Sequence, residues 1–290
     1  MYIQKSFEDR EKGSLYIVPT PIGNLDDITF RALNVLKEAT LIAAEDTRNT
    51  KKLLNHFDIK TPLISYHEHN KQHRTLEIVQ KVANGDMIAL VSDAGMPAIS
   101  DPGYELIQAL IAKDYPVIVL PGANAALCAL IGSGLPTQEF LFYGFLPRKK
   151  QEKNQELERL RSNTATMIFY ESPHRISATV QSIFDVLGDR QMAIARELTK
   201  LHEEYVRGTS SEVLAWLADH QPRGEYCIVV QGHEETEAEK NQLWWSRFSV
   251  KEHVDYLIEN NQLSSKEAIK QVAEERQLPR REVYELYHIK

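Results

Sequence analysis

The sequence predicts an α/β protein with two α/β domains and a small C-terminal helical domain. Short apolar runs alternate with helical patterns as far as residue 231, several of these runs end in loops rich in Gly and Pro, and no strand pattern follows residue 240. A chain of 290 residues is also too long for one small core. The predicted parts are a disordered leader at 1–13, α/β domains at 14–131 and 140–232 joined by a linker at 132–139, and a helical domain at 241–290.

Composition restricts the class of protein. The apolar fraction of 42% is ordinary for a globular protein, and no apolar run reaches the length of a membrane span. The N-terminus lacks a signal-peptide core, and we expect Cys128 and Cys227 to be reduced core residues, so the expected location is the cytoplasm. The net charge of −7 argues against a broad basic surface, so RNA binding would need a local basic patch.

In the first domain, alternation predicts strands at 15–18, 41–44, 62–66, 87–91 and 117–120, with helices at 26–36, 51–57, 74–84, 104–112 and 125–131. Asp26 and Asp27 suit the first turn of a helix, and Gly85 suits the end of one. Strands that alternate with helices form a mostly parallel sheet.

In the second domain, we expect strands at 140–145, 166–170, 192–195 and 226–231, with helices at 149–161, 176–187 and 211–217. The tail begins a helix at Ser264 with a capping-box pattern that ends in Glu267. Pro279 breaks this helix, and a second follows at 280–288. The two helices predict a helix-turn-helix-like bundle.

Three loops at predicted strand ends combine Gly and Pro, at residues 19–24, 92–103 and 121–124. Gly lets the backbone approach a ligand, and Pro stiffens the path of the loop. Ligands of open α/β sheets bind at such carboxyl ends. The loops therefore predict one ligand site.

Charged residues also gather at strand ends, where parallel strands share one edge. They are Glu45, Asp46, Arg48, His67, Glu68, His69, Asp93, Asp101, Glu171, His174, Arg175, Arg196 and Glu197. Each of them alone is equally explained as a helix cap or a structural ion pair. Their concentration beside three Pro/Gly loops favours a functional site.

Several kinds of site are excluded by missing patterns. His67 and His69 have no third His or Cys placed to complete a tetrahedral site, so we expect no metal. Ser92 and Ser172 lack the surroundings of a hydrolase nucleophile, and the chain has neither a P-loop lysine motif nor a G-x-G-x-x-G fingerprint.

Six motifs occur in an order that resembles a known family: PTPIGN at 19–24 with Asp27-Ile28-Thr29, SDAGMPAISDPG at 92–103, LPG at 120–122, GFLP at 144–147, ESPHR at 171–175 and RELTK at 196–200. The sequence is similar to the tetrapyrrole methylase superfamily of S-adenosylmethionine enzymes. Within it, the ribosomal RNA small subunit methyltransferase I branch is the most similar. The resemblance covers residues 15–290.

The resemblance implies a homodimer with S-adenosylmethionine folded into a cleft between the two α/β domains. The implied reaction is methylation of the ribose 2′-hydroxyl of a cytidine in the decoding region of 16S ribosomal RNA. By motif position, the implied cofactor-binding residues are Pro21, Ile22, Asp93, Met96, Asn124, Ala125, Tyr170, Glu171, Glu225 and Tyr226. Met96 replaces a usual Thr, and Ala123-Asn124 replaces Pro-Ser or Pro-Cys, so a hydroxyl contact and the loop rigidity are in question there.

For catalysis, we expect a general base or hydroxyl-orienting group among Glu45, Asp46, Glu171 and Glu197. The residues expected to contact RNA are Arg48, His67, His174, Arg175 and Arg196, with the two histidines as secondary candidates for the base. The tail either binds RNA or braces the dimer. Two alternatives stay open, namely a methyltransferase of the same fold acting on a tetrapyrrole precursor and a noncatalytic ribosome-assembly factor.

Overall fold

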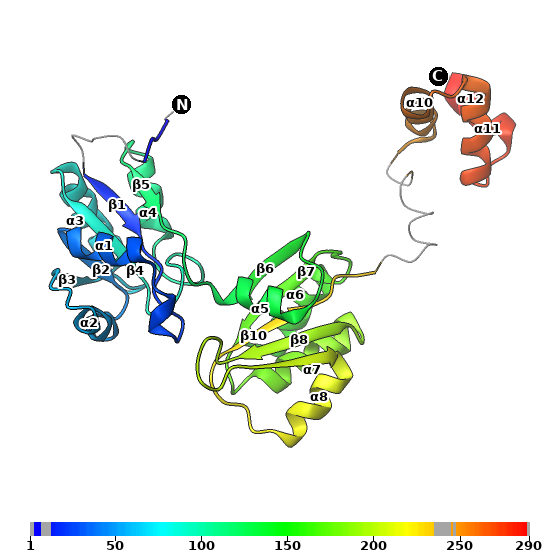
Figure 1. Cartoon of the computed structure of the whole chain (residues 1–290). Helices are drawn as coiled ribbons and strands as arrows, with labels where there is room; N and C mark the ends of the chain where they lie inside the picture. The colour runs from blue at the N-terminus through cyan, green and yellow to red at the C-terminus, as the bar shows by residue number, and fades with distance from the viewer. Residues whose placement is uncertain (1–2, 7–12, 235–244, 246–247, 289–290) are drawn as a thin grey trace. The chain divides into compact units, whose positions relative to one another are not determined.

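A computed structural model describes residues 3–6, 13–234, 245 and 248–288 of the chain, which divides into two compact units at residues 1–232 and 233–290 (Figure 1). The first unit contains two five-stranded sheets. Most of the predicted leader, and the predicted start of the helical domain at 241–244, lie outside the described residues. Within the leader, the Gln4 side chain exchanges two hydrogen bonds with the backbone of Val117, at 2.8 and 3.0 Å.

The first sheet is entirely parallel, as the alternation of strands and helices predicts. Its order is β3-β2-β4-β1-β5. The strands are β1 (Ser14–Ile17), β2 (Leu41–Ala44), β3 (Leu63–Ser65), β4 (Met87–Val91) and β5 (Val117–Val119). Their side chains are buried on both faces, which explains the continuous apolar runs in the sequence.

Helices cover both faces of the first sheet. On one face, α1 (Phe30–Glu38) and α2 (Thr47–His56) pack against Val18, Ala89 and Val91. On the other face, α3 (Lys71–Ala83) and α4 (Tyr104–Ile111) pack against Leu15, Ile17 and Leu90. Residues that follow one another in β1 and β4 thus enter opposite cores, as the two-residue period of a strand requires.

The carboxyl ends of β1 and β4 form the switch point of this sheet. The two strands are adjacent, but the chain leaves β1 into a helix on one face and leaves β4 into a helix on the other. Diverging connections open a crevice where α/β proteins bind ligands. The two loops are joined there, because the backbone groups of Thr20 and Gly95 exchange hydrogen bonds of 2.9 and 3.0 Å.

The second sheet is mixed, in the order β6-β7-β10-β8-β9. Its strands are β6 (Phe140–Phe145), β7 (Thr166–Glu171), β8 (Gln191–Arg196), β9 (Glu204–Thr209) and β10 (Tyr226–Val230). β10 runs antiparallel to both β7 and β8, and Tyr226 at its start lies in register with Glu171 and with Arg196 at their ends. Two strand ends and one strand start therefore meet at the same edge.

Helices also cover both faces of the second sheet. On one face, α6 (Lys150–Leu160), α7 (Ile176–Leu187) and α8 (Ser210–Asp219) form a core with Phe169 and Ile228. On the other, α5 (Ala125–Ser133) packs Ala129 and Leu130 against Ile168. The helix that follows β5 of the first sheet is therefore part of the core of the second sheet, which couples the two halves of this unit.

The C-terminal unit contains three described helices, α10 (Val250–Asn261), α11 (Ser265–Glu275) and α12 (Arg280–His288). They enclose a core of their own that includes Leu257, Ile269, Val272 and Val283. The capping box at Ser264 is confirmed, since the Ser264 side chain accepts from the backbone N–H of Glu267 and the Glu267 side chain accepts from that of Ser264.

Four expectations about local structure are corrected. Strand β9 and helix α10 were not predicted. Asp26 and Asp27 lie in a short 3₁₀ helix (Leu25–Asp27), and α1 begins only at Phe30 because the Thr29 side chain caps it. Cys227 is buried, whereas Cys128 is exposed, because it lies on α5 away from the second sheet. No helix among the described residues is long and apolar enough to cross a membrane.

Candidate functional site

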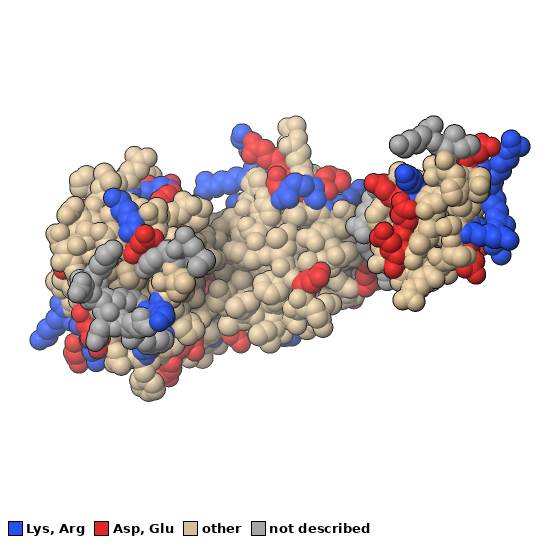
Figure 2. Space-filling model, turned by 90° about the horizontal axis from the view of Figure 1, so that it is seen from above, with Lys and Arg blue, Asp and Glu red and all other residues tan. Residues whose placement is uncertain are grey.

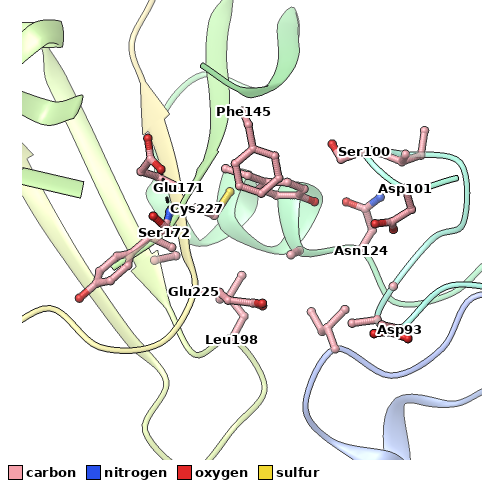
Figure 3. A pocket seen from close by; sticks show the side chains of 18 of the residues that line it. Asp93, Ser100, Asp101, Asn124, Phe145, Glu171, Ser172, Leu198, Glu225 and Cys227 are labelled. Carbon is pink, nitrogen blue, oxygen red and sulfur yellow. Dashed lines mark hydrogen bonds between the residues drawn. The ribbon is translucent and has the colours of Figure 1, made fainter. Parts of the chain in front are cut away.

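A pocket of about 480 Å³ lies at the strand ends of the first unit, and both sheets contribute to its lining (Figure 3). The first half supplies the loops after β1, β2 and β4 and the start of α5. The second half supplies the ends of β6, β7 and β8 and the start of β10. The volume is within the range of small-molecule sites, roughly 300–1,000 Å³.

On the first-sheet side, Asp93 and Glu45 lie at the ends of the neighbouring strands β4 and β2. The carboxylate of Asp93 accepts hydrogen bonds from the backbone N–H of Asp46 and the side chain of Asn49, both at 3.1 Å. Burial, reinforced by the charge of Asp93, raises the pKa of the Glu45 carboxyl. Glu45 is thus a carboxyl group whose proton affinity is set by its surroundings.

Asp101 lies in the loop after β4 and lines the same pocket, beside Asn124 (Figure 3). Burial, and next the negative charge of Glu45, raise the pKa of Asp101 to about 7, against a weaker lowering by the Ser92 hydroxyl. The residues on either side of it, Ala98 and Ser100, both have a φ of 65°, which non-glycine residues adopt at a cost. The loop is therefore held in an unfavourable backbone conformation where it presents this carboxyl group.

On the second-sheet side, Glu171 at the end of β7 is bound on both carboxylate oxygens. One oxygen accepts from the backbone N–H of Ser172 at 2.8 Å, and the other from the Thr179 hydroxyl at 2.7 Å. Arg175 lies 3.3 Å from it, and the Glu171 side chain is 0% exposed. The geometry assigns this carboxylate to holding the turn between β7 and α7.

The ends of β8 and β10 bring Glu197, Lys200 and Glu225 to the pocket. Lys200 donates to Glu197 at 2.9 Å, and this contact is the main reason that the pKa of Glu197 is lowered. Glu197 and Thr199 have φ values of 51° and 67°, so a second strained loop borders the pocket. The hydroxyl of Tyr226, next to Glu225, is buried and has no hydrogen-bond partner among the described residues.

Apolar groups complete the walls, namely Ile22, Met96, Phe145, Tyr170 and Leu198. The rings of Phe145 and Tyr170 lie edge to face, with centroids 5.7 Å apart. Burial raises the pKa of Tyr170 to about 12, so its phenol stays protonated at neutral pH. Asn124 caps α5 by accepting from the backbone N–H of Leu127 at 3.0 Å, which fixes its side chain at the pocket edge.

Most residues that the sequence singles out come together in this pocket. Its lining includes Ile22, Glu45, Asp93, Met96, Asn124, Ala125, Tyr170, Glu171, Glu197, Glu225 and Tyr226. Pro21, predicted as a cofactor contact, is not part of the lining, although its neighbour Ile22 is. The roles assigned to these residues stay predictions.

The other predicted residues lie outside the pocket lining. Asp46 caps α2 and pairs with Arg48, which lowers the pKa of Asp46 to about 2, while the Arg48 side chain is 87% exposed. Arg196 pairs with Glu204 of β9 at 2.6 Å.

The two remaining motif ends also lie away from the lining. Arg175 donates to the carbonyls of Leu146 and Pro147, at 2.8 and 3.2 Å. His67 contacts the Asn70 side chain at 3.2 Å, and His174 is exposed. Among the residues that the structure describes, no group of three or more His, Cys, Asp or Glu side chains is arranged to hold a metal ion.

Sequence reasoning assigned no role to several lining residues, namely Ser100, Asp101, Phe145, Leu198 and Lys200. Asp101 was noted among the charged strand ends, but eight residues separate it from Asp93, so only the fold brings the two together. Each of the five lies in a motif that carries the resemblance, and this was the available signal.

Comparison with known proteins agrees with this geometry. The family model for tetrapyrrole (corrin/porphyrin) methylases matches residues 14–214. The Ribosomal RNA small subunit methyltransferase I of Halalkalibacterium halodurans is 53% identical over 289 residues, which are 99% of each chain. That of Bacillus subtilis is 52% identical over 288 residues, covering 99% of this chain and 98% of the relative.

Solved structures share the fold at low sequence identity. A diphthine synthase superposes with a TM-score of 0.59 at 13% identity, covering 76% of this chain and 90% of its own. A cobalt precorrin-4 methyltransferase superposes with a TM-score of 0.57 at 18% identity, covering 75% of this chain and 94% of its own. The coverage near three quarters corresponds to the two-sheet fold.

Proposed function

The chain belongs to the tetrapyrrole methylase family, and from this premise we propose that it transfers the methyl group of S-adenosylmethionine to small-subunit ribosomal RNA. Relatives that carry this name match the whole chain, C-terminal unit included, whereas the solved structures support the fold alone. The acceptor that we propose is the ribose 2′-hydroxyl of a cytidine in the decoding region of the 16S RNA. The proposed place of action is the cytoplasm.

The pocket residues fit the donor molecule, which combines an adenine, a ribose diol, a sulfonium cation and an amino-acid end. The apolar surfaces of Ile22, Met96 and Leu198 suit the adenine, and the surrounding carboxylates suit the cation. The buried, unpartnered hydroxyl of Tyr226 is available for a polar group of a ligand. We propose that the lining residues of the implied set hold the donor, together with Pro21 through its neighbour Ile22.

When bound, S-adenosylmethionine supplies a methyl group activated by a positively charged sulfur. The task of the chain is to align the acceptor hydroxyl and to remove its proton. Alignment by rigid loops is worth roughly 7–11 kcal/mol of the barrier. The loops joined through Thr20 and Gly95, and the strained backbone at Ala98 and Ser100, provide the rigidity.

For the base, we propose the carboxyl pair of Glu45 and Asp101. The other members of the predicted set are engaged elsewhere: Asp46 with Arg48, Glu171 with the turn before α7, and Glu197 with Lys200. Glu45 and Asp101 both line the pocket and raise each other's proton affinity through charge repulsion. A base with a pKa near neutrality contributes about 10²–10⁴-fold.

Recognition of RNA is proposed for Arg48 and His174, which are exposed, and for His67, Arg175 and Arg196 after local rearrangement of their contacts. We also propose a homodimer. The support for it is the helix α5, whose Leu127 and Ile131 are large apolar side chains exposed to 45% and 76%. Analytical ultracentrifugation at micromolar concentration tests this part, and a monomer would contradict it.

The single observation that carries the proposal is the pocket in which raised-pKa carboxyl groups of one sheet face the apolar and aromatic edge of the other. The test is incubation with methyl-labelled S-adenosylmethionine and small ribosomal subunits from cells that lack the modification. Label should enter the RNA at one cytidine and make the adjacent phosphodiester resistant to alkali, because a methylated 2′-oxygen cannot attack it.

Other outcomes of this experiment separate the alternatives. Label on a base would retain the methyltransferase and reject the ribose as acceptor. Binding of subunits without transfer would favour a noncatalytic assembly factor. Transfer to a tetrapyrrole precursor, with none to RNA, would reject the proposed substrate class.

A further inference from the structure

A groove lies between α11 and α12 of the C-terminal unit, with a volume of about 630 Å³. Ser265, Lys266 and Ile269 of α11 form one wall, and the other comes from α12, through Arg280, Arg281, Tyr284 and His288. These positions recur three or four residues apart on each helix, so they form one continuous stripe per helix. The two stripes face the same hollow.

The charge of the groove differs from that of the segment around it. Residues 248–288 contain six Lys and Arg against eight Asp and Glu. The groove lining nevertheless contains Lys266, Arg280, Arg281 and His288 and no acidic residue. Figure 2 shows Lys and Arg side chains gathered along one edge of this unit, with a separate strip of Asp and Glu. An acidic segment thus presents a local basic surface.

The basic side chains are held in place without being neutralised within the groove. Arg280 donates to the carbonyl of Lys266 at 3.2 Å, which ties the two helices together and leaves its positive charge on the groove. Arg281 pairs with Glu285 at 2.9 Å, but its side chain is 90% exposed. An exposed ion pair of this kind is worth little, so an incoming phosphate competes with the glutamate for Arg281.

An aromatic surface lies beside these charges. The Tyr284 side chain is an exposed large hydrophobic group, at 53%, and its ring lies 4.5 Å from that of His288, measured between centroids. Positive side chains with an accessible aromatic ring are the combination that binds single-stranded nucleic acid, where a base stacks on the ring and phosphates meet the cations. An acidic protein surface would need the charges but not the ring.

We propose that the groove between α11 and α12 binds a single-stranded segment of RNA, with phosphates at Lys266 and Arg281 and a base stacked on Tyr284. The inference rests on the proposed function for the identity of the RNA. It places an RNA-binding site in the C-terminal unit, separate from the pocket of the first unit.

The test uses the full chain with two groove variants and two matched controls. Lys266→Gln with Arg281→Gln removes two charges, and Lys270→Gln removes a charge from the same helix outside the groove lining. Tyr284→Leu removes the ring, and Tyr284→Phe retains it. Equilibrium binding to unmodified small-subunit RNA is measured over a range of salt concentrations, and thermal melts confirm that each variant folds.

The double charge variant should lower the slope of log affinity against log salt by about 1.4, that is about 0.7 for each phosphate contact on a single strand. Tyr284→Leu should weaken binding about 5- to 150-fold, and Tyr284→Phe should bind as the original chain does. In methylation assays, the groove variants should raise KM for the RNA and leave kcat unchanged.

Groove variants with the same affinity and salt slope as their controls would overturn the inference. Displacement of the RNA by poly-glutamate as effectively as by poly-uridylate would also overturn it, because the groove would then select charge alone. The proposed function fails separately. If the original chain binds RNA through the groove but transfers no methyl group, the groove inference stands and the enzymatic proposal falls.

Discussion

The carboxylate of Asp93 accepts a hydrogen bond from the backbone N–H of Asp46 at 3.1 Å, across 47 positions of the sequence. This bond joins the ends of β4 and β2, and Glu45 is the residue between the bond and the end of β2. Two adjacent carboxylates therefore have different positions: Glu45 lines the pocket, whereas Asp46 caps α2. The contrast gives a sharp test of the proposed base.

Replacement of Glu45 by Gln should reduce kcat by about 10²-fold, the lower end of the usual contribution of a general base, because Asp101 remains. The measurement is single-turnover methylation at saturating donor and RNA. Asp46→Asn is the matched control, since Asn is an equally good helix cap and the residue lies outside the pocket lining. Equal losses in the two variants would contradict the assignment.

The pH dependence should report Asp101. Its carboxyl faces Glu45, Asp93 and Glu225 and the hydroxyl of Ser92. With a pKa of about 7, kcat/KM should rise with pH up to about 7 and then level off. Asp101→Asn removes a negative charge beside Glu45, so the remaining base should titrate at lower pH and the plateau should fall. A profile that keeps its midpoint in the variant would reject Asp101.

The same group should affect stability in a defined direction. The pKa of Asp101 is higher in the folded chain than its ordinary value of 3.8, so the folded state binds more protons between about pH 4 and pH 7. The free energy of unfolding should therefore decline as pH rises through this window. Denaturation of Asp101→Asn should show less of this decline than the original chain, and an equal decline in both would place its cause elsewhere.

Glu171 should act through stability. Glu171→Gln leaves amide hydrogens facing the N–H of Ser172 and the hydroxyl of Thr179, at a cost of about 1–3 kcal/mol of unfolding free energy. Turnover measured well below the melting temperature should stay within tenfold of the original. A loss of kcat as large as that of Glu45→Gln, without a lower melting temperature, would return Glu171 to the chemistry.

Gly132 should tolerate no side chain. It lies in α5, its carbonyl accepts from Arg207 of β9 at 2.8 Å, and an added Cβ would overlap the ring of Tyr205. Gly132→Ala should lower the unfolding free energy by about 1–3 kcal/mol through overpacking. The double variant with Tyr205→Ala should recover part of this loss in a double-mutant cycle, and strict additivity of the two changes would contradict the overlap.

Sequence patterns predicted the first sheet well because its strands are buried on both faces and read as continuous apolar runs. They missed β9, whose sequence EYVRGT is only partly buried at the sheet edge and lacks a clear alternation. They also missed α10, which lies in a segment rich in Asn and charged residues and is held by contacts with α11 that no local pattern reveals.

The candidate site divides in the same way. Loop motifs and strand-end charges identified Glu45, Asp93 and Tyr170 as members of one site, and the pocket contains them all. They did not distinguish Glu45 from Asp46, or Glu171 from Glu197, because the distinction depends on which hydrogen-bond donors fold against each carboxylate. The elevated proton affinity of Asp101 likewise arises from neighbours distant in sequence.

The antiparallel course of β10 has a consequence for redesign of the enzyme. Hydrogen bonds to β7 and β8 fix this strand along both edges, while the connection before it, residues 220–225, runs on the surface beside the pocket. Changes in the length of that connection can widen the pocket mouth without shifting the ends of β7 and β8. It is therefore the place to engineer acceptance of synthetic donors that carry alkyl groups bulkier than methyl.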